Sequence, residues 1–304
     1  MIVDYFYLAL YKFFSFLVKL LPTQLLNLLL KSLARFAFFI DKKHTKIIFA
    51  NLDLAYNSTL TKEEKESIAK RVYYNLVQTI IGFMRREKLP KEKLLQNITF
   101  KNTHILENAL KAQKKIVFVT GHYSNWELLP PAITAKFGIT LIGVGRKLDS
   151  EMMDRVLLKN REQFGVEMLY RKGAMKGLIK SLREGKAVGL LVDQSLGEKQ
   201  GGIKVDFFGK SVGHSPAASV LARTFETEII PSFISTDDYE HYTVTFYEPL
   251  PLIKTENKEE DIHLMTQAQA DITQQVIESK PEEWFWVHKR WKSYHPETYS
   301  EYTL

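Results

Sequence analysis

Residues 116–127, IVFVTGHYSNWE, decide the fold prediction for this chain. The run from Ile116 to Thr120 is apolar or β-branched throughout, which predicts a buried strand. The next seven residues contain His122 and, five positions later, the carboxylate of Glu127. We expect a helix to begin within this segment, so that the imidazole lies on a loop at the carboxyl end of the strand. Open α/β sheets bind their ligands at that edge.

His122 and Glu127 are the candidate catalytic pair. A neutral imidazole that is oriented by a carboxylate can remove a proton from an alcohol. Residues 124–127 also fit a capping box, in which Glu127 would only satisfy backbone N–H groups at a helix start. This alternative accounts for Glu127, but it does not account for His122 or for the strand before it.

The whole chain fits an α/β protein with a mixed central sheet flanked by helices. Strand-like and helix-like segments alternate from about residue 116 to 248 of the 304 residues. The formal net charge of +7 suits a partner that carries phosphate or carboxylate groups, or an anionic membrane surface. Nucleic acid is disfavoured, because no zinc finger or RNP-type motif is present. The absence of cysteine excludes disulfides, thiolate nucleophiles and cysteine metal sites.

The first forty residues predict two amphipathic helices, separated by Pro22. Each has a narrow polar stripe and a broad Leu, Phe and Tyr face; the stripes consist of Lys12, Ser15 and Lys19, and of Gln24, Asn27, Lys31 and Arg35. The uncharged run 20–30 is shorter than the roughly 20 apolar residues of a spanning helix. Two core helices are one interpretation. We favour a hairpin that lies in the bilayer interface, with residues 1–45 as the membrane-associating region and residues 46–304 as one domain.

Four further segments place polar side chains near the ends of predicted strands. Arg146 follows one strand, and Asp193 and Gln194 follow another. Arg171 precedes a predicted helix, a suitable position for an anion. Lys210 follows a third strand. Together these segments predict a basic rim around one crevice, although each alone is more often a solvated loop end.

Near the C-terminus, residues 283–292 interleave aromatic residues with cations. Within this segment Arg290 is a candidate substrate-binding residue. The alternative is a packed terminal helix whose cations extend to solvent.

Ser211 lies in a G-x-S-x-G pattern, GKSVG at residues 209–213, that follows a predicted strand. A serine nucleophile of this kind needs a helix to start directly after it. The helix signals here are Ser215 and Pro216, four and five residues later. We therefore keep a serine esterase only as a minor alternative.

Several blocks of sequence resemble the bacterial lipid A biosynthesis acyltransferases, over most of the chain. GHYSNWE is similar to the H-x4-D/E motif of that family, usually written GHxGNWE. The other blocks are NLDLAY (51–56), residues 146–155, LVDQ (191–194), FFGK (207–210), the helix at 216–222 and PEEWFWVHKRWK (281–292). This sequence departs from the pattern at Ser124, where glycine is common, and at Gly82, where glutamate is common.

The resemblance implies transfer of an acyl chain from acyl carrier protein to a hydroxyl of a phosphorylated glycolipid. His122 would be the general base and Glu127 its orienting partner. Arg146 and Arg171 would bind phosphate or stabilise the thioester oxyanion, and Asp193 and Gln194 would line the same crevice. Because a thioester is already activated, neither a metal nor another cofactor is expected.

The resemblance also places the protein at the cytoplasmic face of the inner membrane, as a peripheral or monotopic protein. Another glycolipid, such as a phosphoinositol mannoside, is an alternative acceptor. A membrane-bound lipid-binding protein without catalysis is the alternative outside enzymology, and in it Glu127 would be only a helix cap.

Overall fold

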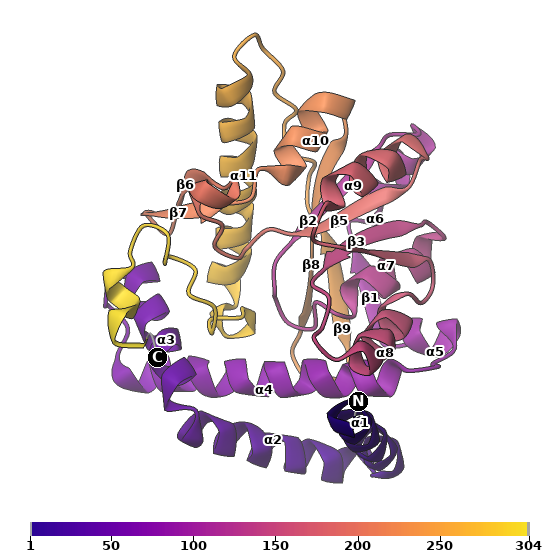
Figure 1. Cartoon of the computed structure of the whole chain (residues 1–304), viewed down its shortest axis with the longest axis vertical. Helices are drawn as coiled ribbons and strands as arrows, with labels where there is room; N and C mark the ends of the chain where they lie inside the picture. The colour runs from indigo at the N-terminus through magenta and orange to yellow at the C-terminus, as the bar shows by residue number, and fades with distance from the viewer. Residues whose placement is uncertain (1, 303–304) are drawn as a thin grey trace.

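A seven-stranded sheet forms the centre of the computed structural model, which describes residues 2–302 (Figure 1). The strand order is β1-β9-β8-β2-β5-β3-β4. The strands are β1 (Ile98–Lys101), β2 (Ile116–Thr120), β3 (Leu141–Gly145), β4 (Val166–Tyr170), β5 (Ala187–Leu191), β8 (Glu228–Thr236) and β9 (Tyr242–Phe246). Strands β8, β2, β5, β3 and β4 are mutually parallel, whereas β9 pairs antiparallel with β8. The predicted mixed α/β fold is confirmed.

Strand β2 lies in the middle of the sheet, between β8 and β5. All five of its residues are buried, as the sequence of Ile116–Thr120 predicts. Successive side chains of a strand point to opposite faces. Ile116 and Phe118 therefore join one apolar core cluster, and Val117 and Val119 join another on the opposite face.

Helices cover both faces of the sheet. The cluster around Phe118 contains residues from α5 (Lys91–Leu95), α6 (Thr103–Lys111) and α7 (Leu129–Phe137). The cluster around Val119 contains residues from α9 (Ala174–Arg183), α10 (Ala217–Phe225) and α11 (Lys258–Ser279). Helix α8 (Glu151–Arg161) precedes the edge strand β4 and begins with Ser150 as its cap. The parallel strands thus present their carboxyl ends at one edge of a sheet that is packed on both faces.

The N-terminal helices form a separate layer below the sheet in Figure 1. They are α1 (Ile2–Leu20), α2 (Thr23–Ile40), α3 (Lys42–Ala55) and α4 (Lys62–Arg86). Thr61 and Glu64 form a capping box at the start of α4, in which each side chain accepts a hydrogen bond from the backbone N–H of the other. Helix α2 lies along α4 and buries one stripe of side chains, at Leu26, Leu30, Ala34 and Phe38.

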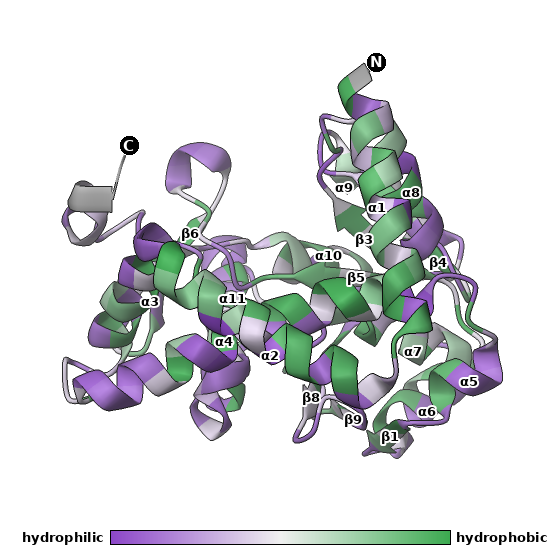
Figure 2. Ribbon diagram, turned by 90° about the horizontal axis from the view of Figure 1, so that it is seen from below, coloured by the Kyte–Doolittle hydropathy of each residue, from purple (hydrophilic) through white to green (hydrophobic). Residues whose placement is uncertain are grey.

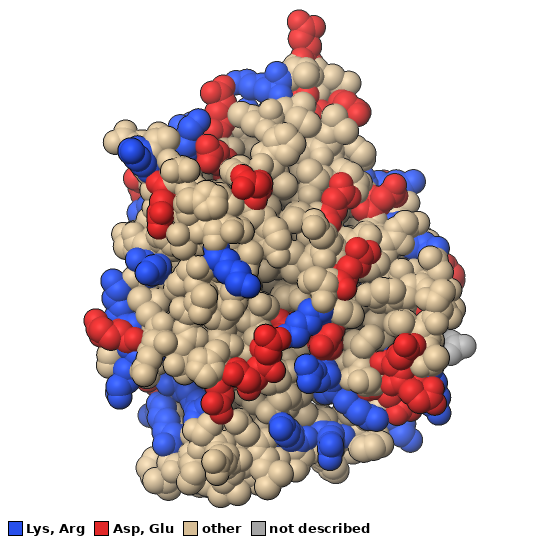
Figure 3. Space-filling model, turned by 180° about the vertical axis from the view of Figure 1, so that it is seen from behind, with Lys and Arg blue, Asp and Glu red and all other residues tan. Residues whose placement is uncertain are grey.

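The outer faces of α1 and α2 are apolar and exposed, and Figure 2 shows that hydrophobic residues make up much of both helices. Most of the exposed large apolar side chains among the described residues are on these two helices, including Phe13 at 58% and Phe39 at 66% exposure. Seen from behind, Lys and Arg side chains gather around this end of the molecule (Figure 3). The domain boundary expected after residue 45 falls inside α3, which is a continuous helix.

The C-terminal segment crosses between the helical layer and a small hairpin. The hairpin consists of β6 (Ile203–Phe207) and β7 (Lys210–His214), preceded by the 3-10 turn η1 (Glu198–Gln200). After α11 come η2 (Pro281–Glu283) and η3 (Glu297–Tyr302), and the terminal helix considered for residues 283–292 does not form. The aromatic residues of this segment pack as expected, because Trp284, Trp286 and Trp291 are fully buried.

Candidate active site

His122 lies on the loop that leaves β2, at the carboxyl edge of the sheet. Its Nδ1 is 2.8 Å from Oδ1 of Asp193, and its backbone N–H donates to Oδ2 of the same carboxylate at 2.7 Å. Asp193 follows β5, the parallel neighbour of β2. The two residues are 71 positions apart in the chain. The sheet therefore brings together an imidazole and a carboxylate that the sequence places far apart.

The Asp193 carboxylate is buried and fully engaged. The indole Nε1–H of Trp284 donates to its Oδ2 at 2.8 Å. Burial alone would raise the pKa of Asp193, but the charge and hydrogen bonds of His122 and the indole of Trp284 outweigh it, and they hold the pKa well below its usual range. Gly121 allows the close approach, because a Cβ at that position would lie only 3.1 Å from Oδ2.

This geometry fixes the tautomer of a neutral His122. An ionised carboxylate only accepts hydrogen bonds, so Nδ1 must carry a proton and donate it to Asp193. Nε2 is then the hydrogen-bond acceptor of the ring. The side chain of His122 is 20% exposed, and the amide Nε2 of Gln194 lies 3.4 Å from its Nε2. The imidazole can thus accept a proton from a group that approaches past Gln194.

Aromatic rings enclose the other side of the imidazole. The centroid of the His122 ring lies 5.2 Å from that of Trp126 and 5.8 Å from that of Phe285. The backbone N–H of Phe285 donates to the His122 carbonyl at 3.0 Å, and the N–H of Ser124 donates to the Glu283 carbonyl at 2.7 Å. The C-terminal segment therefore holds the loop that carries His122.

Glu127 does not orient His122 in this structure. Its carboxylate is bound by the guanidinium of Arg161, through a hydrogen bond of 2.9 Å from Nε and a second from Nη2. Burial would raise the pKa of Glu127, but Arg161, Arg86 and His122 together lower it. The expected pairing is corrected accordingly: Asp193 occupies the position beside the imidazole that we had expected for Glu127.

The capping-box interpretation of Glu127 is also wrong. Helix α7 begins at Leu129, after the segment rather than within it, because two prolines favour its first turn. Ser124 has a left-handed φ of 50° and makes no side-chain cap. At Gly82 in α4, a Cβ would lie 2.9 Å from the Asn125 amide, so this glycine leaves room for the loop.

Arg146 and Arg171 lie side by side on the surface. They follow β3 and β4, which are parallel neighbours, and line a pocket of about 480 Å³ together with Lys147, Tyr170 and Lys172. The side chain of Arg146 is 82% exposed. Arg146 and Arg171 thus form a cluster of cations with the two lysines at the end of the sheet next to α8, whereas Lys210 lies apart on the hairpin and donates to Asn57.

Arg290 is placed differently from our expectation. It is fully buried, and its Nη1 donates to the carbonyls of Gln194 at 2.9 Å and Gly213 at 2.8 Å, while Nη2 lies 2.8 Å from Nδ1 of His214. Burial lowers the pKa of Arg290 to about 10. A guanidinium in this position supports the loop after β5 and is closed off from a substrate.

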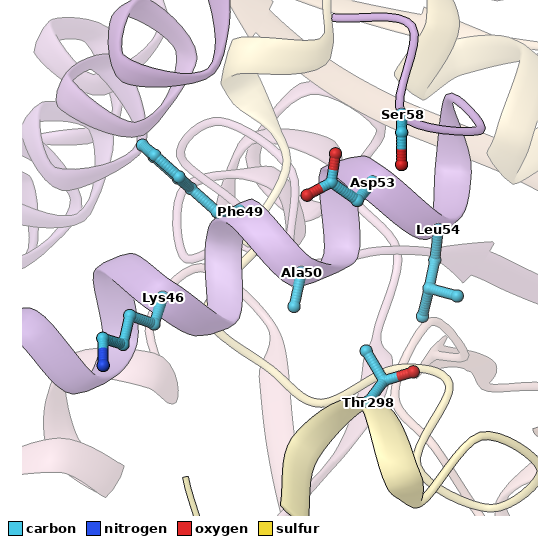
Figure 4. Close-up of a pocket in the computed structure, with 7 residues that line it drawn as sticks. All are labelled: Lys46, Phe49, Ala50, Asp53, Leu54, Ser58 and Thr298. Carbon is cyan, nitrogen blue, oxygen red and sulfur yellow. The ribbon is translucent and has the colours of Figure 1, made fainter. Parts of the chain in front are cut away.

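The geometry around Ser211 argues against a serine nucleophile. Ser211 lies within strand β7 of the antiparallel hairpin, opposite Asp206. A nucleophile elbow requires a turn from a strand into a helix, which this hairpin lacks. A second surface pocket, of about 540 Å³ and shown in Figure 4, lies between α3 and η3 and contains none of the predicted site residues.

Comparison with known families assigns the chain. The family model for bacterial lipid A biosynthesis acyltransferases matches residues 1–293. The chain belongs to this family. It is therefore an acyltransferase, and the resemblance of GHYSNWE and the later blocks to this family is confirmed.

The relatives named for lipid A biosynthesis cover about nine tenths of this acyltransferase. A lipid A biosynthesis myristoyltransferase of Escherichia coli K12 is 22% identical over 92% of the chain and 84% of its own length. A lipid A biosynthesis lauroyltransferase of the same organism is 23% identical over 91% of the chain and 88% of its own. A phosphatidylinositol mannoside acyltransferase of Mycolicibacterium smegmatis is 23% identical over 61% of the chain and 60% of its own.

Three contacts of this acyltransferase site were missed in the sequence. Arg161 looks like an ordinary cation in the last turn of α8, and nothing in its spacing indicates that it binds Glu127. Trp284 and Phe285 are in a block that resembles the family, but their contacts with Asp193 and His122 depend on the path of the chain after α11. The LVDQ block did identify Asp193 as a residue of the crevice, but not that it pairs with His122.

Proposed function

We propose that this acyltransferase moves a fatty acyl chain from an acyl carrier protein thioester to a hydroxyl of a phosphorylated glycolipid, a lipid A precursor. The observation that carries the proposal is the hydrogen-bonded pair of His122 and Asp193, at 2.8 Å, with Nε2 of the imidazole facing the exposed amide of Gln194. Such a pair suits removal of a proton from an alcohol.

In the proposed reaction, Nε2 of His122 takes the proton of the acceptor hydroxyl while the alcohol oxygen attacks the thioester carbonyl. The tetrahedral intermediate then breaks its C–S bond, and the imidazolium returns the proton to the leaving thiolate. Asp193 keeps the imidazole in the required tautomer and stabilises its positive charge. A positioned base contributes about 10²–10⁴-fold to such a step.

Gln194 is the nearest candidate to stabilise the oxyanion. Its side-chain amide reaches 3.4 Å from Nε2 of His122, so it lies where the acceptor hydroxyl and the thioester must meet. A rotation of the amide would direct its N–H groups to the developing negative charge. A donor already aimed at the oxyanion contributes about 10²–10³-fold, which sets the upper limit for an amide that first has to rotate.

A phosphorylated acceptor fits the charges near the site. Arg146 and Arg171, with Lys147 and Lys172, form the surface pocket beside α8 and supply fixed positive charge. Relatives named for lipid A biosynthesis match over about nine tenths of this chain, against 61% for the mannoside acyltransferase. We therefore favour a lipid A precursor over a phosphoinositol mannoside.

The N-terminal helices would hold the enzyme at the cytoplasmic face of the inner membrane. Helix α2 is long and apolar enough to cross a bilayer. Core helices of soluble proteins often have the same length and composition, so these two properties alone do not make it a membrane span. Because α2 lies along α4 and buries its inner stripe there, we propose that the hairpin lies in the interface rather than spanning the membrane.

Charged substitutions on the outer face of α2 test this arrangement. In the double variant Phe36→Glu/Phe39→Glu we expect membrane partitioning to fall by at least about tenfold, because each phenylalanine contributes roughly 1.5–3 kcal/mol when buried in an apolar environment. Both side chains are exposed, at 60% and 66%, so the fold should persist. Co-sedimentation with anionic vesicles measures the change.

The matched control is Leu252→Glu/Leu264→Glu, two exposed apolar side chains away from α1 and α2. Its partitioning should equal that of the wild-type protein. Unchanged sedimentation of the α2 variant would refute the interfacial hairpin.

Mass spectrometry of the lipid product tests the proposed reaction. The enzyme is incubated with a mixture of acyl carrier protein thioesters and, in separate reactions, with a lipid A precursor or a phosphoinositol mannoside. We expect the lipid A precursor to gain one acyl chain, whose length identifies the preferred donor. Acylation of the mannoside alone would reassign the acceptor, and no acylation of either glycolipid would contradict the proposal.

A further inference from the structure

Arg86 is a buried guanidinium without a hydrogen-bond partner, next to the candidate active site. It is the last residue of α4 and is only 3% exposed. None of its three nitrogens has a hydrogen-bond partner among the described residues. Its nearest defined contact is the ring of Phe83, whose centroid is 5.5 Å from the guanidinium carbon. Buried charges in proteins are normally paired, so an unpaired one needs an explanation.

No acceptor pairs with the Arg86 guanidinium among the described residues. Arg86 interacts electrostatically with Glu127 and Arg161, but the Glu127 carboxylate already forms two hydrogen bonds with Arg161. The carboxylate of Asp154 also interacts with Arg161 and not with Arg86, so the N–H donors of Arg86 stay unsatisfied. The group that would complete this cluster is therefore an anion with oxygen acceptors.

Helix α1 covers this cluster. The phenol of Tyr11 lies near Arg86 and Asn160, and α1 packs against both α4 and α8. Polar contacts hold it there: Ser15 and Lys19 donate to the Glu87 carboxylate at 3.5 Å and 3.2 Å, and the Asp4 carboxylate accepts a hydrogen bond from Ser150. The outer face of α1 is apolar and exposed. A helix with such an outer face can shift when that face enters a lipid layer.

The cluster connects to the cationic surface pocket. A Cβ at Gly145 would lie 3.2 Å from Nη1 of Arg161, so the guanidinium passes directly beside the end of β3. The next residue, Arg146, lines the surface pocket with Arg171. Arg161, itself paired with Glu127, thus lies between this pocket and Arg86.

We propose that Arg86 is an anion-binding residue that receives a phosphate group of the substrate when α1 moves aside. This inference rests on the proposed function for its source of phosphate, and two sources share the chemistry. One is the phosphate of the glycolipid acceptor; the other is the phosphodiester of the carrier protein's pantetheine arm. The guanidinium provides the planar set of donors that suits phosphate oxygens.

Kinetics of Arg86→Gln and Arg86→Lys separate these sources. We expect Arg86→Gln to raise the KM for a phosphorylated acceptor by roughly 10- to 100-fold, the usual effect of losing hydrogen bonds to a charged group. With the dephosphorylated acceptor, its KM should equal that of the wild-type enzyme. Arg86→Lys keeps the charge but loses the planar donors. Its KM for the phosphorylated acceptor should therefore lie between those of the wild-type enzyme and of Arg86→Gln.

The control is Arg85→Gln, which removes the neighbouring exposed guanidinium that donates to Thr23. Its KM values should be unchanged. A rise confined to the KM of the donor thioester would support the anion site and assign it to the donor. Two results for Arg86→Gln would overturn the proposal. One is an equal loss of kcat with both acceptors at unchanged KM; the other is no change in kcat or KM.

Calorimetric titration with inorganic phosphate in detergent gives a readout that needs no turnover. We expect saturable binding by the wild-type protein and by Arg146→Gln/Arg171→Gln, and at least tenfold weaker binding by Arg86→Gln and Arg86→Lys. If only the surface double variant lost binding, Arg86 would have no such role. A wild-type protein that binds phosphate through Arg86 but acylates no glycolipid would contradict the proposed function alone.

Discussion

Replacing His122 by alanine is expected to lower the rate of acyl transfer by about 10²–10⁴-fold, the usual contribution of a positioned general base. The protein should stay folded, because the side chain is 20% exposed and Asp193 keeps its hydrogen bonds from the Trp284 indole and from the backbone N–H of residue 122. Single-turnover rates with an acyl carrier protein thioester, alongside circular dichroism, measure both effects.

Asp193→Asn is the companion variant, and it tests the corrected pairing. An amide cannot fix the tautomer as a carboxylate does; in serine proteases the equivalent change costs about 10⁴-fold in kcat. His104→Ala, which removes an exposed histidine on α6, is the control and should leave the rate unchanged. Near-normal turnover by either site variant would remove the pair from the mechanism.

The Asp193 variant should also differ in its pH dependence. The pKa of Asp193 is lowered in the folded protein, so its carboxylate stabilises the fold above its ordinary pKa of 3.8, and this contribution is lost as the pH falls below that value. The difference in unfolding free energy between wild type and Asp193→Asn should therefore shrink in acid. Urea unfolding of both proteins between pH 3 and pH 7 measures this difference. A difference in unfolding free energy that stays constant over this range would contradict an ionised Asp193 that stabilises the fold.

The sequence predicted the central elements because their signals are local. The apolar run Ile116–Thr120 can only be a buried segment, and Thr61 with Glu64 marks a helix start by itself. Edge strands β1 and β4 were missed, since they are only four and five residues long and partly exposed, which is too short for a clear pattern. The amphipathic helices α1 and α2 were visible because a polar stripe repeats every three or four residues.

The partner of His122 could not be predicted, since it depends on the order of strands in the sheet. Five positions of separation favour Glu127, but a parallel sheet places the residue after β5 beside the residue after β2, whatever their separation in sequence. The role of Arg290 could not be predicted from the sequence either. A cation between tryptophans fits both a substrate-binding residue and a buried structural residue. Its contacts with the carbonyls of Gln194 and Gly213 decide for the structural role.

Replacing Arg161 by methionine is expected to destabilise the protein by about 3–5 kcal/mol, because it leaves the Glu127 carboxylate buried without its hydrogen-bond donors. The side chains are only 25% and 15% exposed, so solvent cannot substitute for the lost partner. Urea unfolding at pH 7 measures this loss. Acyl transfer should fall as well, since Glu127 precedes the helix that follows the His122 loop and its displacement would disturb the cleft.

The double variant Arg161→Met/Glu127→Gln supplies the decisive comparison. Removing both charges of a buried pair is often close to neutral, so most of the stability should return. Arg161 holds the pKa of Glu127 below its ordinary 4.5, which means that the pair stabilises the fold above that pH and loses its effect in acid. The deficit of Arg161→Met should therefore narrow as the pH falls below 4.5. A loss below about 1 kcal/mol at pH 7, the scale of an exposed ion pair, would show that Glu127 is solvated or held by another group such as Arg86.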